Sequence, residues 1–176
     1  MDDTSVKGKD WILKKFNEEK VNFYKENFNL SEILSKLIAI RNLKPEEVKL
    51  FLNPKIKNLL PDPFKLKDMS KCVKRTIKAI YNDEKIGIFG DYDVDGATST
   101  ALLANYFYDL GQVTNFYIPD RKTEGYGPSQ VGFEKLTKNG SNLIFTVDCG
   151  TLSFETINSY QKKNIDILVL DHHQSE

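Results

Sequence analysis

Side chains that could bind a divalent metal ion follow three separate apolar runs of this 176-residue sequence. Three aspartates at alternate positions come after residues 86–90, one aspartate comes after residues 143–147, and an Asp-His-His triplet comes after residues 165–170. These side chains are Asp91, Asp93, Asp95, Asp148, Asp171, His172 and His173. Carboxylates gathered in one place repel one another strongly unless cations neutralise them. If the three segments meet, they indicate a hydrolytic site built around divalent metal.

The elements around these side chains predict that the three segments do meet. Short runs rich in Ile and Val, separated by helical segments, are typical of buried parallel strands. We expect strands at 86–90, 113–118, 143–147 and 165–170, alternating with helices at 97–110, 129–139 and 154–162. Ligands bind at the carboxyl ends of the strands in such sheets. The sequence therefore predicts an α/β fold, a parallel sheet with flanking helices, that carries the polar side chains on one rim.

The first half of the chain has a different pattern. We expect residues 1–30 to form an arm or short elements that dock elsewhere, because their apolar residues are scattered among polar ones. Ser31 and Pro45 are typical of helix starts, and a third, amphipathic helix is expected at 69–81. The expected domains are a mostly helical N-terminal leader at 1–84 and the α/β domain at 85–176.

Composition limits the class of protein. Hydrophobic residues make up 40% of the chain, which favours a packed globular protein over a disordered one. No apolar run approaches the ~20 residues of a membrane helix, so we expect no membrane contact. The acidic start is unlike a secretory signal, and Cys72 and Cys149 are too far apart to indicate a disulfide framework or a zinc site. A reducing cytoplasm is the expected location.

The net charge of zero conceals an asymmetry between the two halves. Residues 1–85 carry 19 basic and 13 acidic side chains, whereas residues 86–176 carry 6 and 12. The acidic half is the one that contains the predicted metal site. The basic half could face a polyanion, although scattered lysines of this kind are also typical of a solvated surface.

Three other interpretations of the segment from Asp91 to Gly96 are weaker. A calcium-binding helical-hand loop needs a glutamate at its twelfth position, where this chain has Leu102. An aspartyl phosphatase would use Asp93 as nucleophile and Asp95 as acid, but it would leave the Asp-His-His triplet unexplained. A simple helix cap needs one carboxylate and not three.

The Asp171-His172-His173 triplet contains the only two histidines of the chain. Neutral imidazole is a preferred ligand for ions such as Mn²⁺ or Zn²⁺, and a carboxylate commonly orients it. Because neighbouring side chains point in different directions, one histidine can bind metal while the other contacts phosphate. A titrating surface pair is the alternative. Asp148 alone could be a helix cap, and Cys149 is expected to be a small buried residue.

The segment 121–127 follows the second predicted strand and is therefore expected on the same rim. Arg121 could hold a phosphate through two hydrogen bonds, and Tyr126 could stack on a base. The glycines on either side of Tyr126, Gly127 among them, let the backbone approach a ligand closely. An ordinary turn would explain the same residues.

Taken together, these motifs resemble those of the DHH phosphoesterase superfamily. The resemblance rests on Gly-Asp-Tyr-Asp-Val-Asp-Gly, Glu-Gly-Tyr-Gly, Val-Asp-Cys-Gly and Asp-His-His, in this order. It is closest to the single-strand-specific exonucleases of the superfamily. Parts of the leader also resemble those proteins: Trp11-Ile12-Leu13, Phe51-Leu52-Asn53-Pro54 and Leu60-Pro61-Asp62-Pro63-Phe64. The resemblance thus covers nearly the whole chain.

The resemblance implies a two-metal site that takes Mn²⁺ or Mg²⁺ and degrades single-stranded DNA from its 5′ end, in DNA repair and recombination. The implied metal ligands are Asp93, Asp95, Asp148 as the bridging ligand, and His172, with Asp91 as a further candidate. The resemblance also implies that His173 contacts the scissile phosphate and that Asp171 orients or supports the site. The implied substrate contacts are Arg121, Tyr126 and Gly127.

The chain departs from the family pattern after its third motif. It stops three residues after His173, whereas the family continues with a further aspartate ligand on a later strand and with a second domain that grips substrate. We therefore expect an N-terminal fragment with an incomplete sheet, an exposed sheet edge and little activity of its own. Two alternatives stay open. One is another phosphoesterase of the superfamily, acting on short oligonucleotides, cyclic dinucleotides or pyrophosphate, and the other is a non-catalytic binding module.

Overall fold

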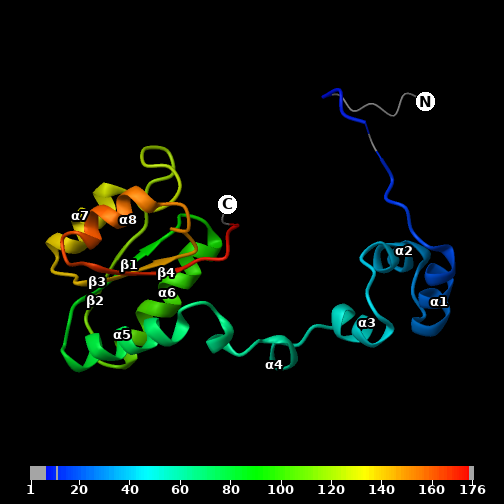
Figure 1. Cartoon of the computed structure of the whole chain (residues 1–176), viewed down its shortest axis with the longest axis horizontal. Helices are drawn as coiled ribbons and strands as arrows, with labels where there is room; N and C mark the ends of the chain where they lie inside the picture. Colours follow the sequence, from blue (N-terminus) through cyan, green and yellow to red (C-terminus); the bar gives the residue numbers. More distant parts are fainter. Residues whose placement is uncertain (1–6, 11, 175–176) are drawn as a thin grey trace. The chain divides into compact units, whose positions relative to one another are not determined.

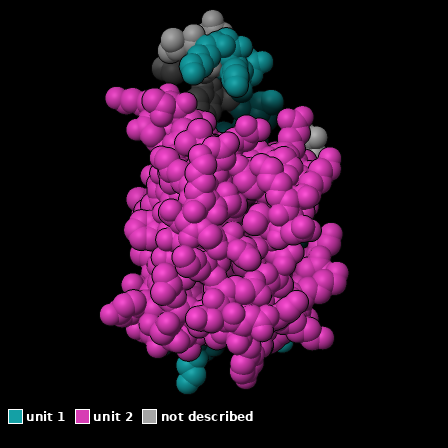
Figure 2. Space-filling model, turned by 90° about the vertical axis from the view of Figure 1, so that its left-hand side faces the viewer, with its two compact units in different colours: residues 1–62 teal, residues 63–176 magenta. Residues whose placement is uncertain are grey.

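The chain folds into two compact units, residues 1–62 and residues 63–176, which Figure 2 shows in different colours. The computed structural model describes residues 7–10 and 12–174. Trp11, the first residue of one leader motif, lies outside the described residues. We call residues 1–62 the N-terminal unit and residues 63–176 the sheet unit.

The N-terminal unit is helical, as expected for the leader (Figure 1). Its helices are α1 (Glu18–Phe28), α2 (Glu32–Ile40), α3 (Pro45–Leu52) and α4 (Ile56–Leu59). In residues 1–30, where an arm or short docking elements were expected, Glu18–Phe28 form the short helix α1, which packs against α2. The Asn17 side chain caps this helix by accepting a hydrogen bond from the Lys20 amide. Val21 and Tyr24 lie three residues apart on one face and are buried in a cluster with Ile38 of α2.

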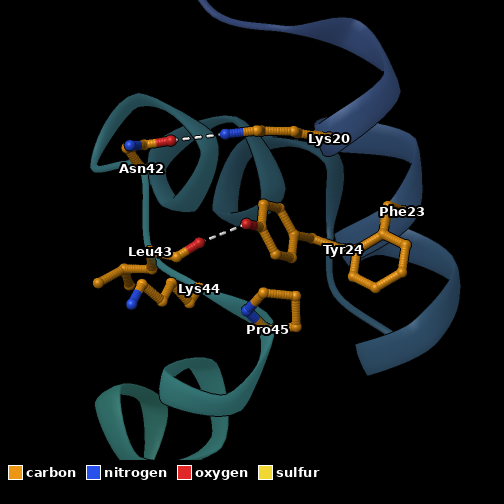
Figure 3. A pocket seen from close by; sticks show the side chains of 7 residues that line it. All are labelled: Lys20, Phe23, Tyr24, Asn42, Leu43, Lys44 and Pro45. Carbon is orange, nitrogen blue, oxygen red and sulfur yellow. Dashed lines mark hydrogen bonds between the residues drawn. The ribbon is translucent and has the colours of Figure 1, made fainter.

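Two side-chain hydrogen bonds hold the turn between α2 and α3 against α1 (Figure 3). The Tyr24 hydroxyl donates to the carbonyl of Leu43, and the Lys20 ammonium donates to the Asn42 side-chain oxygen. A pocket of about 410 Å³ lies beside this turn. Its lining residues are Lys20, Phe23, Tyr24, Asn42, Leu43, Lys44 and Pro45. The turn therefore has a defined shape that is set by α1.

The sheet unit alternates helices with strands. Its elements are η1 (Pro63–Lys65), α5 (Met69–Tyr81), β1 (Ile86–Gly90), α6 (Val94–Asp109), β2 (Thr114–Tyr117), α7 (Gln130–Lys138), β3 (Leu143–Val147), α8 (Phe154–Gln161) and β4 (Asp166–Leu170). The four strands pair in parallel in the order β2-β1-β3-β4. The predicted parallel α/β fold is confirmed. None of the helices in the described part of the chain has the length and apolar character needed to cross a membrane.

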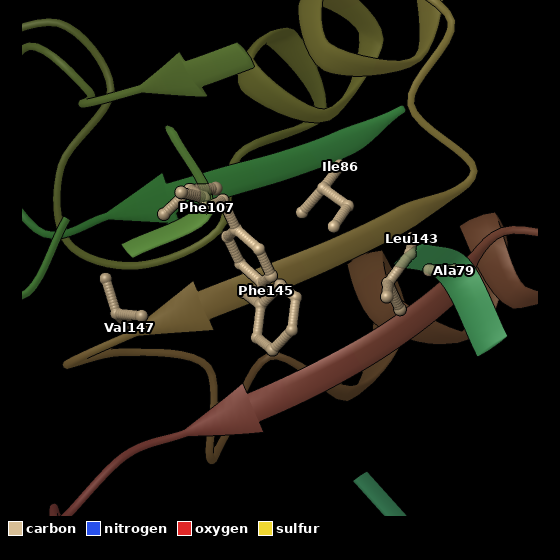
Figure 4. Close-up of a cluster of buried hydrophobic side chains, with 7 residues drawn as sticks. Ala79, Ile86, Phe107, Leu143, Phe145 and Val147 are labelled. Carbon is tan, nitrogen blue, oxygen red and sulfur yellow. The ribbon is translucent and has the colours of Figure 1, made fainter. Parts of the chain in front are cut away.

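Helices cover both faces of the sheet, with α5 and α6 on one side and α7 and α8 on the other (Figure 1). Successive side chains of a strand point to opposite faces, so each central strand contributes to two cores. Ile86 and Ile88 of β1 pack with Phe107 of α6, whereas Phe89 packs with Phe133 of α7. Figure 4 shows the first of these clusters, in which the Phe107 and Phe145 rings lie 5.6 Å apart. Fully burying one such aromatic side chain contributes about 1.5–3 kcal/mol.

The sheet unit begins earlier than the domain boundary that was expected between residues 84 and 85. Helix α5 was assigned to the leader, but its residue Ala79 is fully buried in the core beside Ile86. Arg75 of the same helix forms ion pairs with Glu84 at 2.6 Å and with Asp166 at 2.5 Å. These contacts tie α5 to the start of β4, so the structural division falls between residues 62 and 63.

The strand register brings three chain segments to one edge of the sheet. Gly90 pairs with Val147, and Val147 pairs with Leu170, so the last residues of β1, β3 and β4 lie in one row. An aspartate follows each of these three residues. The strand order also changes direction between β1 and β3, which is where open α/β sheets bind ligands. This edge is therefore the candidate functional site.

Candidate metal centre

The first group of carboxylates at this edge follows β1. Asp93 is the N-cap of α6, where its side chain accepts a hydrogen bond from the Gly96 amide at 3.0 Å. Asp91 is 2% exposed, and its Oδ1 atom is buried without a hydrogen-bond partner in the described residues. Burial raises the pKa of Asp91, and the negative charge of Asp93 acts in the same direction. A buried carboxylate oxygen without a partner is costly, so a cation at this position would stabilise it.

Asp148 is held at the end of β3 by contacts with its backbone. Its φ of 59° lies in the left-handed region, and its amide donates a hydrogen bond to the Leu170 carbonyl at 2.9 Å. Its side chain is 6% exposed, and Oδ1 lies 3.1 Å from Nε2 of His172. Burial raises the pKa of Asp148, the Asp93 charge adds to this, and the histidines oppose it. The carboxylate is thus placed between residues from the other two segments.

Two groups of possible metal ligands share Asp148. One consists of Asp91, Asp93 and Asp148, and the other of Asp148, His172 and His173. Within each group, one ligand atom from every residue lies within 4.8 Å of the others. Asp148 is the residue that both of these groups contain. The donors are carboxylate oxygens and imidazole nitrogens, which suit Mn²⁺, and the partnerless oxygen of Asp91 fits a cation as well.

Asp95 does not belong to either group found among the described residues. It was expected to be a ligand, whereas Asp91 was only a further candidate. The structure places Asp95 in the first turn of α6, where it is exposed, because the Asp93 cap starts this helix at Val94 and not at residue 97. Its charge still contributes to the raised pKa of Asp148. The direct role predicted for Asp95 stays a prediction.

The Asp171 carboxylate contacts the loop that follows β3 and the neighbouring His173. Its Oδ2 accepts hydrogen bonds from the amide and hydroxyl of Thr151, at 2.9 and 2.6 Å. Its Oδ1 accepts from the His173 amide at 3.1 Å and lies 2.7 Å from His173 Nδ1. Burial would raise the pKa of Asp171, but these hydrogen bonds outweigh burial and hold the pKa well below its usual range. The Asp171 carboxylate thus contacts both the amide and the ring of His173, and its predicted orienting role stays a prediction.

Tyr126 connects the loop after β2 with the ends of β3 and β4. Its hydroxyl donates to the Asp148 carbonyl at 3.3 Å and lies 3.0 Å from His173 Nδ1. The rings of Tyr126 and His173 meet edge to face, 5.5 Å apart. The hydroxyl of Tyr126 is thus directed toward Asp148 and His173, and its predicted contact with substrate stays a prediction. The hydrogen bond with Asp171 raises the pKa of His173, which favours its charged form.

The remaining predicted substrate contacts lie on the same loop. The Arg121 guanidinium lies 5.3 Å from the centre of the Tyr92 ring, and its positive charge acts to lower the pKa of Asp91. Arg121 is exposed at the rim, where a phosphate could reach it. Gly127 is buried with a φ of 85°, so it shapes the loop.

Sequence reasoning missed two residues that build this site. Thr151 anchors Asp171, although its position shortly after the Val-Asp-Cys-Gly motif carries no signal of that role. Glu124 anchors the loop of Tyr126 through hydrogen bonds from Tyr117, Ser129 and the Asp120 amide, and its place in Glu-Gly-Tyr-Gly was the available signal. Cys149 is fully buried, and burial strongly raises the pKa of its thiol, so it is a core residue as expected.

The candidate centre opens into a groove of about 1180 Å³ along β4. The groove reaches from Asp148 and His172 past Leu168 and Val169 to Lys71 at the start of α5. Among the described strands, β4 pairs only with β3, so its outer edge is open. The expected exposed sheet edge is confirmed for the described residues.

The fold and the site together define an α/β protein with a centre of carboxylates and imidazoles at the switch point of a parallel sheet. The model of the "DHH family, N-terminal domain" matches residues 85–176. The chain belongs to the DHH family.

Relatives of known name agree with this assignment. The single-stranded-DNA-specific exonuclease RecJ of Bacillus subtilis is 34% identical over 93% of this chain and 21% of its own length. RecJ of Haemophilus influenzae is 37% identical over 69% of this chain and 21% of its own length. The chain thus spans about a fifth of the length of these curated relatives.

Two solved structures resemble the fold. Exonuclease RecJ bound to manganese superimposes with a TM-score of 0.58 at 31% identity, over 63% of this chain and 29% of that protein. RecJ of Thermus thermophilus in complex with Mn²⁺ gives a TM-score of 0.63 at 21% identity, over 91% of this chain and 22% of that protein. The second likeness concerns the fold alone.

Proposed function

We propose that this chain carries the metal-binding part of an exonuclease that hydrolyses single-stranded DNA with two divalent ions, Mn²⁺ or Mg²⁺. The observation that carries the proposal is the position of Asp148. This buried carboxylate belongs to both ligand groups and contacts His172 at 3.1 Å. Relatives named single-stranded-DNA-specific exonucleases and a related structure bound to manganese support the substrate and the metal.

In this proposal Asp91, Asp93, Asp148 and His172 would hold two ions, and Asp148 is the residue common to both ligand groups. When bound, two such ions would lower the pKa of a water molecule and offset the charge of the scissile phosphate. Asp95, two residues after the cap, would add negative charge near the centre. A cation would also satisfy the buried Asp91 oxygen that has no hydrogen-bond partner among the described residues.

The other residues bind and orient the phosphate. Asp171 contacts Nδ1 of His173 and raises the pKa of this histidine, so that the charged ring can donate a hydrogen bond from its opposite nitrogen to a phosphate oxygen. Arg121 can hold another phosphate oxygen through two parallel hydrogen bonds, and Tyr92 supports its guanidinium. We propose that the chain acts on the 5′ end, in DNA repair and recombination. The two free cysteines suit the reducing cytoplasm, where we place the protein.

Metal binding by this chain tests the first half of the proposal. Titration calorimetry with Mn²⁺ should give two sites in the unaltered chain, and Asp148→Asn should weaken both by at least tenfold. Asp109→Asn, a change of an exposed aspartate at the end of α6, serves as the control and should leave both sites intact. If Asp148→Asn bound Mn²⁺ like the unaltered chain, the proposed centre would be wrong.

Substrate choice tests the second half. With excess Mn²⁺, the little activity expected of the chain should appear as slow release of nucleotides from a single-stranded oligonucleotide labelled at its 3′ end. A duplex of the same sequence should stay intact. The same preparation is offered pyrophosphate and a cyclic dinucleotide. Hydrolysis of either of these, with single-stranded DNA left intact, would assign the chain to another branch of the family.

A further inference from the structure

The Glu124 side chain holds the loop between β2 and α7 in place through hydrogen bonds. One carboxylate oxygen, Oε1, accepts hydrogen bonds from the Tyr117 hydroxyl at 2.6 Å and from the Asp120 amide at 3.0 Å. The other, Oε2, accepts from the Ser129 hydroxyl at 2.6 Å. Short hydrogen bonds to a carboxylate are about twice as strong as those between neutral groups. A single side chain thus accepts hydrogen bonds from the end of β2, from the loop and from the start of α7.

The donors fix both ends of that loop to the body of the sheet unit. Tyr117 is the last residue of β2, and its ring packs against Phe89 of β1 with centroids 5.7 Å apart. Ser129 is the N-cap of α7 and accepts from the Gly132 amide while it donates to Glu124. Glu124 therefore joins the end of a strand to the start of a helix.

Tyr126 stands two residues beyond Glu124, between two glycines whose backbones need the left-handed region. The φ angles are 79° at Gly125 and 85° at Gly127, conformations that other residues adopt only with strain. They turn the chain so that the Tyr126 hydroxyl reaches the Asp148 carbonyl and His173 Nδ1. The position of the Tyr126 hydroxyl therefore depends on the hydrogen bonds by which Glu124 holds the loop.

We propose that Glu124 is a positioning residue, which acts through Tyr126 to hold the ends of β3 and β4 in the geometry that binds metal. The effect on metal affinity rests on the proposed function. The effect on loop order and on the His173 ring does not. Among residues 7–10 and 12–174, the hydrogen bonds of Glu124 reach Tyr117, Asp120 and Ser129 and none of the candidate ligands, so its influence on the centre has to pass along the loop.

Hydrogen exchange and ring nitrogen spectra test the local part of this proposal. Glu124→Ala should speed amide exchange at residues 120–127 by at least tenfold and shift the ring signals of His173, which are resolvable because the chain has two histidines. Glu124→Gln keeps an acceptor for Tyr117 and Asp120, so it should restore most of the protection. Glu134→Ala, at an exposed glutamate of the adjoining helix α7, should change neither reading. Unchanged exchange and an unchanged His173 signal in Glu124→Ala would overturn the proposal.

A double-mutant cycle in Mn²⁺ affinity tests whether the influence passes through Tyr126. Glu124→Ala and Tyr126→Phe should each weaken binding by about tenfold, the lower end of the range that is usual for groups that support metal ligands. The double variant should be no weaker than the weaker single variant. If the loss of Mn²⁺ affinity in the double variant were the product of the losses in the two single variants, Glu124 would not act through Tyr126. If the unaltered chain bound no Mn²⁺, the proposed function would fail, whereas the exchange and ring signals would still decide the role of Glu124.

Discussion

Thr151 holds Asp171 through both of its donors, the backbone amide at 2.9 Å and the hydroxyl at 2.6 Å, and both reach the same carboxylate oxygen. The other oxygen of Asp171 is thereby left to His173. The orientation of His173 thus depends on a threonine 20 residues before Asp171, in the loop that follows a different strand.

Thr151→Val should weaken the hold of Asp171 on the His173 ring without removing any of the proposed metal ligands. The valine side chain has the shape of threonine, and the hydrogen bond from the backbone amide of residue 151 to Asp171 is kept, but the hydroxyl is lost. Hydrogen bonds to charged groups contribute about 1.5–3 kcal/mol. We expect the free energy of unfolding to fall by about 2 kcal/mol in denaturant titrations, with Mn²⁺ affinity changed by less than threefold.

The matched control for this variant is Thr137→Val, which removes a hydroxyl that donates to the neutral Phe133 carbonyl within α7. Its cost should be about 1 kcal/mol or less. If the two variants lost the same stability, the charge of Asp171 would not matter to its bond with Thr151.

Glu124 should make stability depend on pH. Partial burial acts to raise the pKa of Glu124, but the hydrogen bonds from Ser129, Tyr117 and the Asp120 amide outweigh it, so the pKa is lowered from its ordinary 4.5. A lowered carboxyl pKa contributes stability that is fully present above 4.5 and is lost as the pH falls through the value in the folded protein. Glu124→Gln removes the titrating group.

We therefore expect Glu124→Gln to be less stable than the unaltered chain by about 1 kcal/mol at pH 7. Chemical denaturation from pH 7 down to pH 3 should show this difference shrinking below pH 4.5. A difference that stayed constant over the whole range would contradict the assignment.

Asp91→Asn tests whether Asp91 is a metal ligand or a carboxylate with a purely structural role. Without metal, the buried charge of Asp91 costs free energy in the folded state, as the raised pKa of Asp91 indicates. The neutral variant removes this charge and should be more stable by about 1–3 kcal/mol. In thermal unfolding this is a rise of a few degrees in Tm, because about 1 kcal/mol corresponds to ~2–4 °C for a domain of this size.

Bound metal should stabilise the same variant less than it stabilises the unaltered chain. Saturating Mn²⁺ should raise the Tm of Asp91→Asn by clearly fewer degrees than that of the unaltered chain, while Asp109→Asn should respond like the unaltered chain. An Asp91→Asn protein with an undiminished Mn²⁺ response would remove Asp91 from the set of ligands.

Gly96→Ala tests the close approach between α6 and the segment that carries Asp91. A Cβ at position 96 would lie 2.4 Å from the Asp91 carbonyl oxygen and 2.6 Å from its Cα, and backbone atoms cannot move aside cheaply. Such overpacking costs about 1–3 kcal/mol, although alanine is otherwise the better helix former by up to ~1 kcal/mol.

We expect Gly96→Ala to lower both the free energy of unfolding and the Mn²⁺ affinity, measured by denaturation and calorimetry. Ala97→Gly, the neighbouring exposed position of α6, should lose ~1 kcal/mol of stability through helix propensity and keep its Mn²⁺ affinity. A stabilised Gly96→Ala would show that the contact with Asp91 relaxes easily.

Much of the site could be predicted because its signals are local. Runs of β-branched residues form strands wherever they are buried, and strands alternating with helices must run in parallel. An aspartate that follows such a strand therefore lies at the carboxyl edge of the sheet. This reasoning brought Asp91, Asp148 and Asp171 to one rim, and the register of β1, β3 and β4 agrees with it.

The sequence by itself determined the sheet, its carboxyl edge and the kinds of ligand atoms found there, since these follow from short-range patterns. Only the tertiary structure decided which carboxylates reach a common point. Asp91 is buried beside Asp148, whereas Asp95 is exposed, because the direction of each side chain depends on where β1 ends and α6 begins. Glu124 and Thr151 also needed the fold, because their hydrogen bonds join chain segments that local sequence patterns do not connect.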